Sequence, residues 1–549
     1  MDDRIELLVL DFKARRYTRR QFVTKALELG VTAAALPALF EMAGRSLGLR
    51  SAEGSLPIAE AAPATRTLVL GQPEPVDNPD PPILGNVSFG SARPVVNNIN
   101  EGILRFKTGT VDVEPSLAAS WDISPDGLVY TFRLRPAKFH DGTPVTAQAI
   151  KLNYDRQMDD NHPYHFPGMT YKEIVFSSIS KVEVVNPTTL RITQSRPSVL
   201  LLGLLAMYVE GIVSPAALQK YGKDYFMHPT GSGPYKFERW VKGGEFVTSA
   251  NADYWGGRSW LNQAIWRTTS DDTVRLQQLL NNEIDVSLGL DPKDIGRVRA
   301  DNRFQVITGT LLNTMNMLMN TKRPPFDKLE ARQAVQFAIN KENIKKAVFF
   351  DAFTVGAGPI APGLLGYDKS LESVYAYNPT RAKELVQKSG AGGIPLTVVH
   401  INPAFWPQIA QLVLADLQAA GFNVTLQSMD TSAFLAKINA GEHQMSLGQW
   451  VYDTGDPDNI MFTTFSTPRA DSRLGYQNPE VTKLNTDAQV ERSPDKRRDM
   501  YNKAQRLVLD DAAYVTVGYR GLAWGAKATI KGLVIGPLGD AVMRGVTIG

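Results

Sequence analysis

The chain has 549 residues, of which 43% are hydrophobic and 21% charged, a composition typical of folded globular proteins. The 59 basic and 56 acidic residues leave a net charge of +3, which excludes the strongly basic surface of a nucleic-acid-binding protein. There is no cysteine, so disulfides, thiolate metal sites and cysteine nucleophiles are excluded. At roughly 150 residues per domain, the length indicates three or four domains.

The first 65 residues differ from the rest of the chain and resemble an export signal. Arg19 and Arg20 supply a basic part, residues 26–40 a short apolar part, and residues 59–64 a small-residue region typical of a cleavage site. The paired arginines resemble a twin-arginine signal, which exports folded proteins. An amphipathic N-terminal helix is the alternative. Without a cysteine to carry a lipid, we expect a periplasmic protein that is not lipid-anchored.

Residues 66–250 show mainly the two-residue periodicity of strands and hairpins. Large apolar side chains alternate through residues 128–134, which predicts a half-buried strand. Further hairpins are predicted around the turns at residues 186–187 and 242–244. Between the first two hairpins, a helix is predicted to begin near Thr146. This part of the chain is therefore expected to be rich in antiparallel strands.

Helices and strands alternate in the second half of the sequence. Residues 331–339 place apolar side chains on one face of a helix. Asn378 caps the start of another helix, and Gly390 ends it. Alternating methionines at residues 315–319 indicate a strand, whose side chains either adapt to a ligand or pack in the core.

Residues 394–450 contain the most informative pattern, three strands separated by two helices. The strands are residues 394–401, 422–429 and 444–450. The first helix begins at Pro407, and Ser432 caps the second. A βαβαβ unit predicts parallel strands with right-handed crossovers. Ligands of such sheets bind beyond the carboxyl ends of the strands, which are the loops beginning at His400, Met429 and Trp450.

The order of these regions indicates one domain inserted into another, because strand-like residues return at 514–519 and 528–535. Two lobes joined by two crossings are expected to leave a cleft between them. The expected parts are a signal and linker at 1–65, lobe I at 66–310 with a strand-rich subdomain at about 109–224, lobe II at 311–517, and a return to lobe I at 518–549.

The motifs of common enzymes are missing from the sequence. There is no H-E-x-x-H, no G-x-S-x-G and no phosphate-binding P-loop. The motifs of penicillin-binding enzymes occur in the wrong order, since Lys107-Thr108-Gly109 precedes Ser178 and Lys181. We therefore expect a protein that is not an enzyme, with no catalytic residue, no metal site and no cofactor.

The loop from Trp450 to Asn459 is the strongest candidate for ligand binding. It combines aromatic side chains with three carboxylates at the end of a strand. Trp450 and Tyr452 are predicted to exclude water, so that Asp453 pairs with a ligand ammonium group. The alternative is that Asp453 accepts hydrogen bonds from backbone N–H groups of its own loop. The later part of the loop, from Asp456, is typical of turns and helix caps.

A second loop, from His400 to Trp406, precedes the helix at Pro407. A helix N-terminus favours anions, and His400 and Asn402 add side-chain donors. Trp406 either lines the cleft or covers the helix, and His400 alternatively has a structural role. With Asp453 on the neighbouring loop, the two loops are predicted to hold a zwitterion.

Several segments in consistent order resemble one family, the extracellular solute-binding proteins of family 5. They are residues 117–121, 126–135, 138–144, 231–237, 251–257, 320–326 and 332–340. The likeness covers about residues 66–549. Proteins of this family serve ATP-binding-cassette (ABC) importers for peptides, nickel chelates, opines and some oligosaccharides.

The resemblance implies an α/β, two-lobed periplasmic-binding-protein fold of type II, cluster C, with an extra subdomain in the first lobe and hinged closure around the ligand. In dipeptide-binding members an aspartate that matches Asp453 takes the ligand amine. Where those members carry an arginine for the ligand carboxylate, an ungapped match places His400. This departure counts against a simple dipeptide as the ligand.

These observations predict a monomeric periplasmic substrate-binding protein of an ABC importer. Its expected partners are a small-molecule solute, peptide or opine-like, and a membrane permease, with no nucleic acid. One alternative is a non-peptide solute such as an oligosaccharide or a metal chelate. Others are a secreted hydrolase or transferase, or a binding protein that feeds a signalling receptor or acts as a holdase.

Overall fold

The computed structural model describes residues 25–26, 66–86, 93–169, 171–350, 352–402, 405–452 and 454–549. The chain forms two compact units, residues 1–65 and 66–549. Apart from residues 25 and 26, the predicted signal segment lies outside the described residues, and so does Asp453. Within the described part of the chain, no helix combines the length and the apolar character needed to cross a bilayer.

The N-terminal half of the second unit is built on five strands in the order β11-β1-β10-β9-β8. Their bounds are β1 Thr67–Gln72, β8 Tyr235–Trp240, β9 Glu245–Ala250, β10 Gln263–Thr268 and β11 Val286–Ser287. β1 runs parallel to β10 and β11, whereas β9 runs antiparallel to β10 and β8. The hairpin predicted around residues 242–244 is confirmed as β8 and β9.

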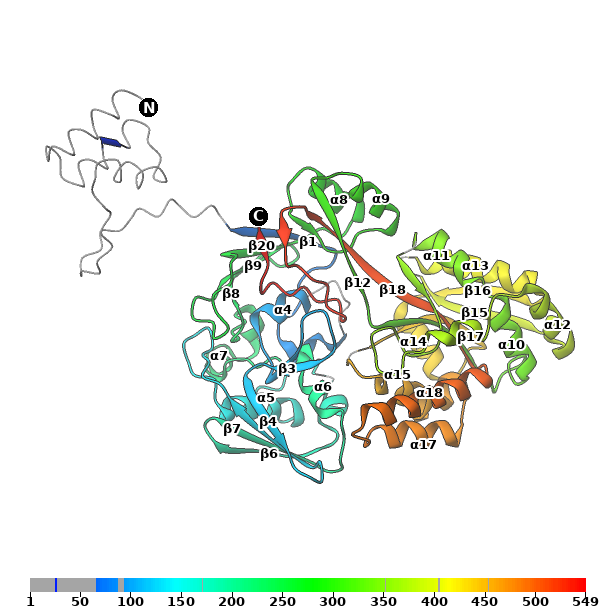
Figure 1. Cartoon of the computed structure of the whole chain (residues 1–549), viewed down its shortest axis with the longest axis horizontal. Coiled ribbons are helices and arrows are strands. Elements are labelled where there is room, and N and C mark those ends of the chain that lie inside the picture. The colour runs from blue at the N-terminus through cyan, green and yellow to red at the C-terminus, as the bar shows by residue number, and fades with distance from the viewer. Residues whose placement is uncertain are drawn as a thin grey trace. The chain divides into compact units, whose positions relative to one another are not determined.

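A separate four-stranded antiparallel sheet lies in this half, in the order β4-β5-β7-β6 (Figure 1). Its strands are β4 Ala118–Ile123, β5 Val129–Leu134, β6 Ile179–Asn186 and β7 Thr189–Gln194. The predicted half-buried strand and the hairpin at residues 186–187 are confirmed by β5 and by the pairing of β6 with β7. The predicted helix is α5 (Ala147–Met158), which Thr146 caps by accepting from the Ala149 backbone N–H.

The remaining elements of this half are short. They are α4 Arg93–Ile99, β2 Leu104–Phe106, β3 Val113–Pro115, α6 Leu201–Leu205, α7 Pro215–Tyr221, α8 Asp272–Leu280 and α9 Ile295–Arg299. A 3-10 turn, η4 (Tyr208–Glu210), places the fully buried Glu210 carboxyl in the same half.

The C-terminal half contains the predicted βαβαβ unit, with sheet order β16-β15-β17-β13. The strands are β13 Asn313–Met319, β15 Pro395–Ile401, β16 Asn423–Met429 and β17 Met445–Val451. β15 runs parallel to both β16 and β17, which confirms the predicted direction of the strands. The alternating methionines of β13 are fully buried in the core of this half, so the structure supports their packing role.

Helices cover both faces of this sheet (Figure 1). Their bounds are α10 Leu329–Ala338, α11 Lys341–Val348, α12 Pro379–Ser389, α13 Trp406–Ala419, α14 Thr431–Asn439, α15 Asp458–Phe465, α16 Pro468–Leu474, α17 Pro479–Ala488 and α18 Pro494–Asp510. The predicted caps Asn378 and Gly390 are confirmed for α12. The predicted cap Ser432 is wrong: Asp430 caps α14, because its carboxylate accepts from the Ala433 backbone N–H at 2.9 Å.

One long strand, β18 (Tyr514–Lys527), joins the two halves (Figure 1). Its first part pairs with β13 and with β14 (Phe353–Val355), and its last part pairs with β11. β12 (Phe304–Thr310) runs antiparallel to it from Gly521 to Lys527. The prediction that a strand ends at residue 519 is therefore wrong. Residues 528–535 contribute little strand beyond β19 (Ile530–Lys531), which pairs with β20 (Thr547–Ile548).

Candidate functional site

A cavity of about 850 Å³ lies where the two halves meet along β18. Leu522 and Trp524 of β18 line it from one side, and Phe349, Phe405 and Gln449 line it from the C-terminal half. Its volume is within the range of about 300–1,000 Å³ that is usual for small-molecule sites. The mixture of aromatic walls and scattered polar groups is also typical of such sites. The cavity is therefore the leading candidate for the binding site.

The charged groups that line the cavity are mostly paired with one another. Arg275 of α8 forms an ion pair with Asp272, and Lys293 forms one with Asp291. Arg275 also donates to the Gly289 carbonyl at 2.8 Å, which ties α8 to the strand end at β11. These contacts fix the wall of the N-terminal half and leave its cations neutralised.

Arg520 of β18 is different, because its guanidinium has no ion-pair partner among the described residues. The side chain is half-buried and lines the cavity, with its Cζ atom 5.2 Å from the centroid of the Phe405 ring. Its backbone is held in place, since the Arg520 N–H donates to Asn313 Oδ1 at 3.0 Å. Burial lowers the pKa of Arg520. A fixed, partly desolvated cation facing a cavity is suited to an anionic ligand group.

The strand end that precedes Asp453 is held by two aromatic side chains. Tyr452 is fully buried, and its hydroxyl donates to the Pro359 carbonyl at 2.7 Å and accepts from the Ala361 N–H at 3.2 Å. Burial raises the pKa of Tyr452. Trp450 is half-buried, and its Nε1–H donates to Asn459 at 2.8 Å. Both residues therefore fix the loop in which Asp453 stands.

The part of the loop after Asp453 is fixed by carboxylates. Asp456 accepts two hydrogen bonds of 2.9 Å from Arg497 Nη2. Asp458 is buried and accepts from Gln489 Nε2 at 3.0 Å. Burial, reinforced by the charge of Asp456, raises the pKa of Asp458 to about 7. The predicted turn is present, since Asp456 Oδ1 accepts from the Asp458 backbone N–H at 2.9 Å, but no side chain caps α15.

The structure places the predicted residues of the second loop in different environments. His400 is 3% exposed, with Nδ1 2.9 Å from the Ile401 carbonyl oxygen. Asn402 is exposed, and its backbone N–H donates to the Met429 carbonyl at 2.9 Å. Trp406 is 3% exposed and packs in the core of the C-terminal half against Phe405.

None of the predicted site residues that the structure describes lines the cavity, but two direct neighbours do. Phe405 precedes Trp406, and Gln449 precedes Trp450. Phe405, Gln449 and Arg520 line the cavity and were not among the residues predicted from the sequence. The available signal for Arg520 was an arginine within an otherwise apolar run, from Tyr514 onward.

Two α/β halves that share one sheet and enclose a cavity at their junction define a two-lobed binding protein. The family model described as "Bacterial extracellular solute-binding proteins, family 5 Middle" matches residues 112–472, and the chain belongs to this family. This family is one of binding proteins. The α/β, two-lobed fold class predicted from the sequence is confirmed.

Known proteins are similar over most of the chain. Di/tripeptide-binding protein 2 of Pseudomonas aeruginosa is 29% identical, over 82% of this chain and 88% of the relative. Heme-binding protein A of Haemophilus influenzae is 28% identical, over 85% of this chain and 89% of the relative. The periplasmic binding protein DppA from Helicobacter pylori, solved in complex with the peptide STSA, has a TM-score of 0.74 and 28% identity, covering 88% of this chain and 98% of that one.

Proposed function

We propose that this protein is the periplasmic substrate-binding protein of an ABC importer, which captures a small peptide or peptide-like solute and delivers it to a membrane permease. The observation that carries the proposal is the cavity of about 850 Å³, because residues of both lobes line it. A solute held there contacts both lobes at once, and it stabilises a closed arrangement if those contacts are better in the closed state than in the open one.

A peptide is the proposed solute for two reasons. The relatives include a di/tripeptide-binding protein and a solved complex with a peptide. The cavity also combines hydrophobic walls, which suit varied side chains, with a cation at Arg520 that suits an anionic group. A similar relative named for heme makes a non-peptide solute the competing proposal, which the experiment below distinguishes.

The proposed recognition retains the residues predicted from the sequence. Asp453 pairs with the ligand ammonium, and Trp450 and Tyr452 hold the strand end that presents it. His400, Asn402 and Trp406 form the neighbouring loop, in which Phe405 reaches the cavity. Arg520 then supplies the charge for the anionic end of the solute, since His400 stands where an arginine was expected.

The proposal also includes the export route and the chemistry. The protein is exported in folded form by a twin-arginine-type signal, remains free of a lipid anchor, acts as a monomer and releases its solute chemically unchanged. Binding without turnover distinguishes it from a secreted hydrolase or transferase. Delivery to a permease distinguishes it from a receptor-feeding protein or a holdase.

The test is identification of the solute that remains bound to protein purified from its native host. Native mass spectrometry should show a peptide-sized adduct. Calorimetry with that solute should give a Kd in the micromolar range or below, which corresponds to a binding free energy of about −8 kcal/mol or more negative. Small-angle scattering should show compaction at saturation. A heme or metal chelate as the adduct would contradict the peptide proposal, and hydrolysis of the solute would contradict the binding function.

A further inference from the structure

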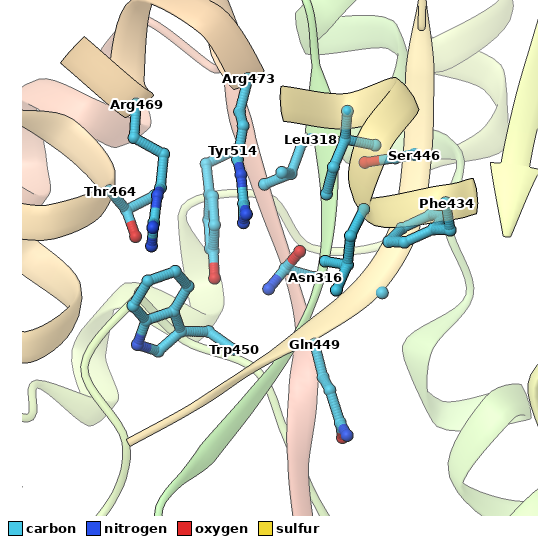
Figure 2. Close-up of a pocket in the computed structure, with 13 residues that line it drawn as sticks. Asn316, Leu318, Phe434, Ser446, Gln449, Trp450, Thr464, Arg469, Arg473 and Tyr514 are labelled. Atoms are coloured by element: carbon cyan, nitrogen blue, oxygen red, sulfur yellow. The ribbon is translucent and has the colours of Figure 1, made fainter. Parts of the chain in front are cut away.

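A second, smaller pocket lies within the C-terminal lobe, between the sheet and the helices α14 and α16 (Figure 2). Its volume is about 40 Å³. The polar side chains that matter for its chemistry are Asn316, Thr464, Arg469, Arg473 and Tyr514, with the Trp450 ring beside them. A space of this size holds a group comparable to a few water molecules at most, so it accepts a carboxylate and not an entire peptide.

Two guanidinium groups line this pocket without a carboxylate. None of the lining residues is acidic, and neither Arg469 nor Arg473 forms an ion pair with any described residue. Arg473 donates through Nε to Asn439 at 2.8 Å, and the Cζ atom of Arg469 lies 5.6 Å from the Trp450 ring centroid. Burial, and then the charge of Arg469, lowers the pKa of Arg473 to about 10. The two guanidinium groups repel each other, and an anion bound between them would offset this repulsion.

Two buried hydroxyl groups provide the second observation. Tyr514 is 1% exposed and Thr464 is 7% exposed; the Thr464 hydroxyl has no hydrogen-bond partner in the described structure, and the Tyr514 hydroxyl has only a weak contact with the Asn316 side chain. Figure 2 shows the Tyr514 hydroxyl directed toward the space beside Trp450 and Asn316. Buried polar groups are normally satisfied, so two poorly satisfied hydroxyls in one pocket indicate a missing partner.

The donors in the pocket specify the kind of group that fits. Guanidinium groups only donate hydrogen bonds, and each of the two hydroxyls can donate its O–H. The matching partner is a group that only accepts, which is the property of an ionised carboxylate. A neutral amide offers one acceptor oxygen and brings an NH₂ group toward the guanidinium groups, so it fits poorly.

We propose that this pocket binds a carboxylate through Arg469, Arg473 and the hydroxyls of Tyr514 and Thr464. Gln449 of β17 is a lining residue of both this pocket and the main cavity, and Trp450 stands three residues before Asp453 in the sequence. We take the carboxylate to be an acidic side chain of the transported solute, which rests on the proposed function, or a free carboxylate anion. In the first case the protein selects acidic peptides over neutral ones.

The test compares solutes that differ only in this group. Calorimetry with the dipeptide pairs Gly-Glu and Gly-Gln, and Glu-Gly and Gln-Gly, should show at least tenfold tighter binding of the glutamate member in one pair. In Arg473→Gln this preference should disappear while the affinity for the glutamine member stays unchanged. Arg469→Gln, at an exposed position, gives the same readout if Arg473→Gln does not fold. Arg498→Gln is the matched control, because Arg498 is exposed on α18 and pairs with Asp495.

A second measurement needs no peptide. Acetate at the same ionic strength as chloride should raise the melting temperature of the wild-type protein, and should not raise that of Arg473→Gln. If acetate stabilises only the wild-type protein but the glutamate and glutamine dipeptides bind equally well, the pocket binds a free anion. That outcome overturns the proposal that the protein selects acidic solutes. The same acetate result with no dipeptide bound at all excludes simple dipeptides as the solute and leaves the carboxylate pocket supported. If neither acetate nor glutamate distinguishes wild type from Arg473→Gln, the pocket proposal is overturned.

Discussion

Arg497 of α18 holds both carboxylate oxygens of Asp456 at 2.9 Å. The pair is 10% and 22% exposed, and Arg497 also donates to the Ala488 carbonyl at 2.8 Å. Since Asp456 stands three residues after Asp453, this contact ties the proposed ligand loop to the longest described helix of the lobe. The position of the loop therefore depends on a residue that is remote in sequence.

Replacement of Arg497 is expected to affect both stability and binding. Arg497→Met leaves Asp456 without its partner and should lower the free energy of unfolding by about 3 kcal/mol, the lower end of the range for breaking a buried pair. It should also weaken the bound solute, because the loop loses its anchor. Urea unfolding and calorimetry measure the two effects. Arg498→Met, at the neighbouring exposed position, should change neither, and an unaltered affinity in Arg497→Met would show that the anchor is dispensable for binding.

Asp453 is predicted to provide the charge that holds a ligand amine. Asp453→Ala should weaken an amine-bearing solute on the order of a hundredfold or more, because loss of one partner of a buried ion pair costs about 3–5 kcal/mol. Titration calorimetry with the co-purified solute and its N-acetylated form checks this. The acetylated form should bind wild type and variant with similar, weak affinity. Equal affinity of the free amine for both proteins would remove Asp453 from the site.

Arg520 is predicted to act on the ligand and not on the fold. Arg520→Gln should weaken an anionic solute by about tenfold or more, equivalent to about 1.4 kcal/mol, since the guanidinium has no other ion-pair partner in the described chain. The melting temperature should stay near that of the wild type, and Arg520→Lys should retain part of the affinity. A large loss of thermal stability with unchanged affinity would assign Arg520 a structural role instead.

Glu210 should make stability depend on pH. Burial raises the pKa of its fully buried carboxyl to about 8, so the folded protein retains a proton that the unfolded chain releases near pH 4.5. The stabilising contribution of the protonated form is complete below pH 4.5 and is lost as the pH rises to about 8. Glu210→Gln should therefore stabilise the protein at pH 8 and flatten its profile between pH 5 and 8. Calorimetric unfolding between pH 5 and 8 measures this. The prediction is contradicted if the free energy of unfolding changes with pH to the same extent in the wild type and in Glu210→Gln.

Local signals in the sequence predicted much of the fold. Asn378 and Gly390 ended α12 as expected, because a side-chain cap and a left-handed glycine depend on few neighbours. Asp430 and Ser432 are competing caps within three residues, and the spacing of the apolar residues does not distinguish them. Such boundaries are decided by the packing of the whole helix.

The main errors concern long-range structure. Arg520 and Gly521 interrupt the apolar alternation, so the sequence indicated a strand end, whereas β18 continues because its backbone pairs with β14 and β12 at these residues, and the Arg520 side chain lines the cavity. Similarly, the sequence identified the loops at Trp406 and Trp450 but not which neighbour faces the cavity. That choice depends on how the two lobes meet, which no local pattern contains.

The passage of β18 through both lobes restricts the motion available to the protein. Its backbone is hydrogen-bonded to β13 in one lobe and to β12 in the other, so sliding of the lobes would break ladders on both sides. Between these two ladders, Tyr519 and Arg520 pair only with the three-residue strand β14, so we expect bending at this short segment. We therefore expect Arg520 to lie near the pivot, where displacement is smallest, so that a solute bound to Arg520 keeps this contact while the outer edges of the lobes move furthest.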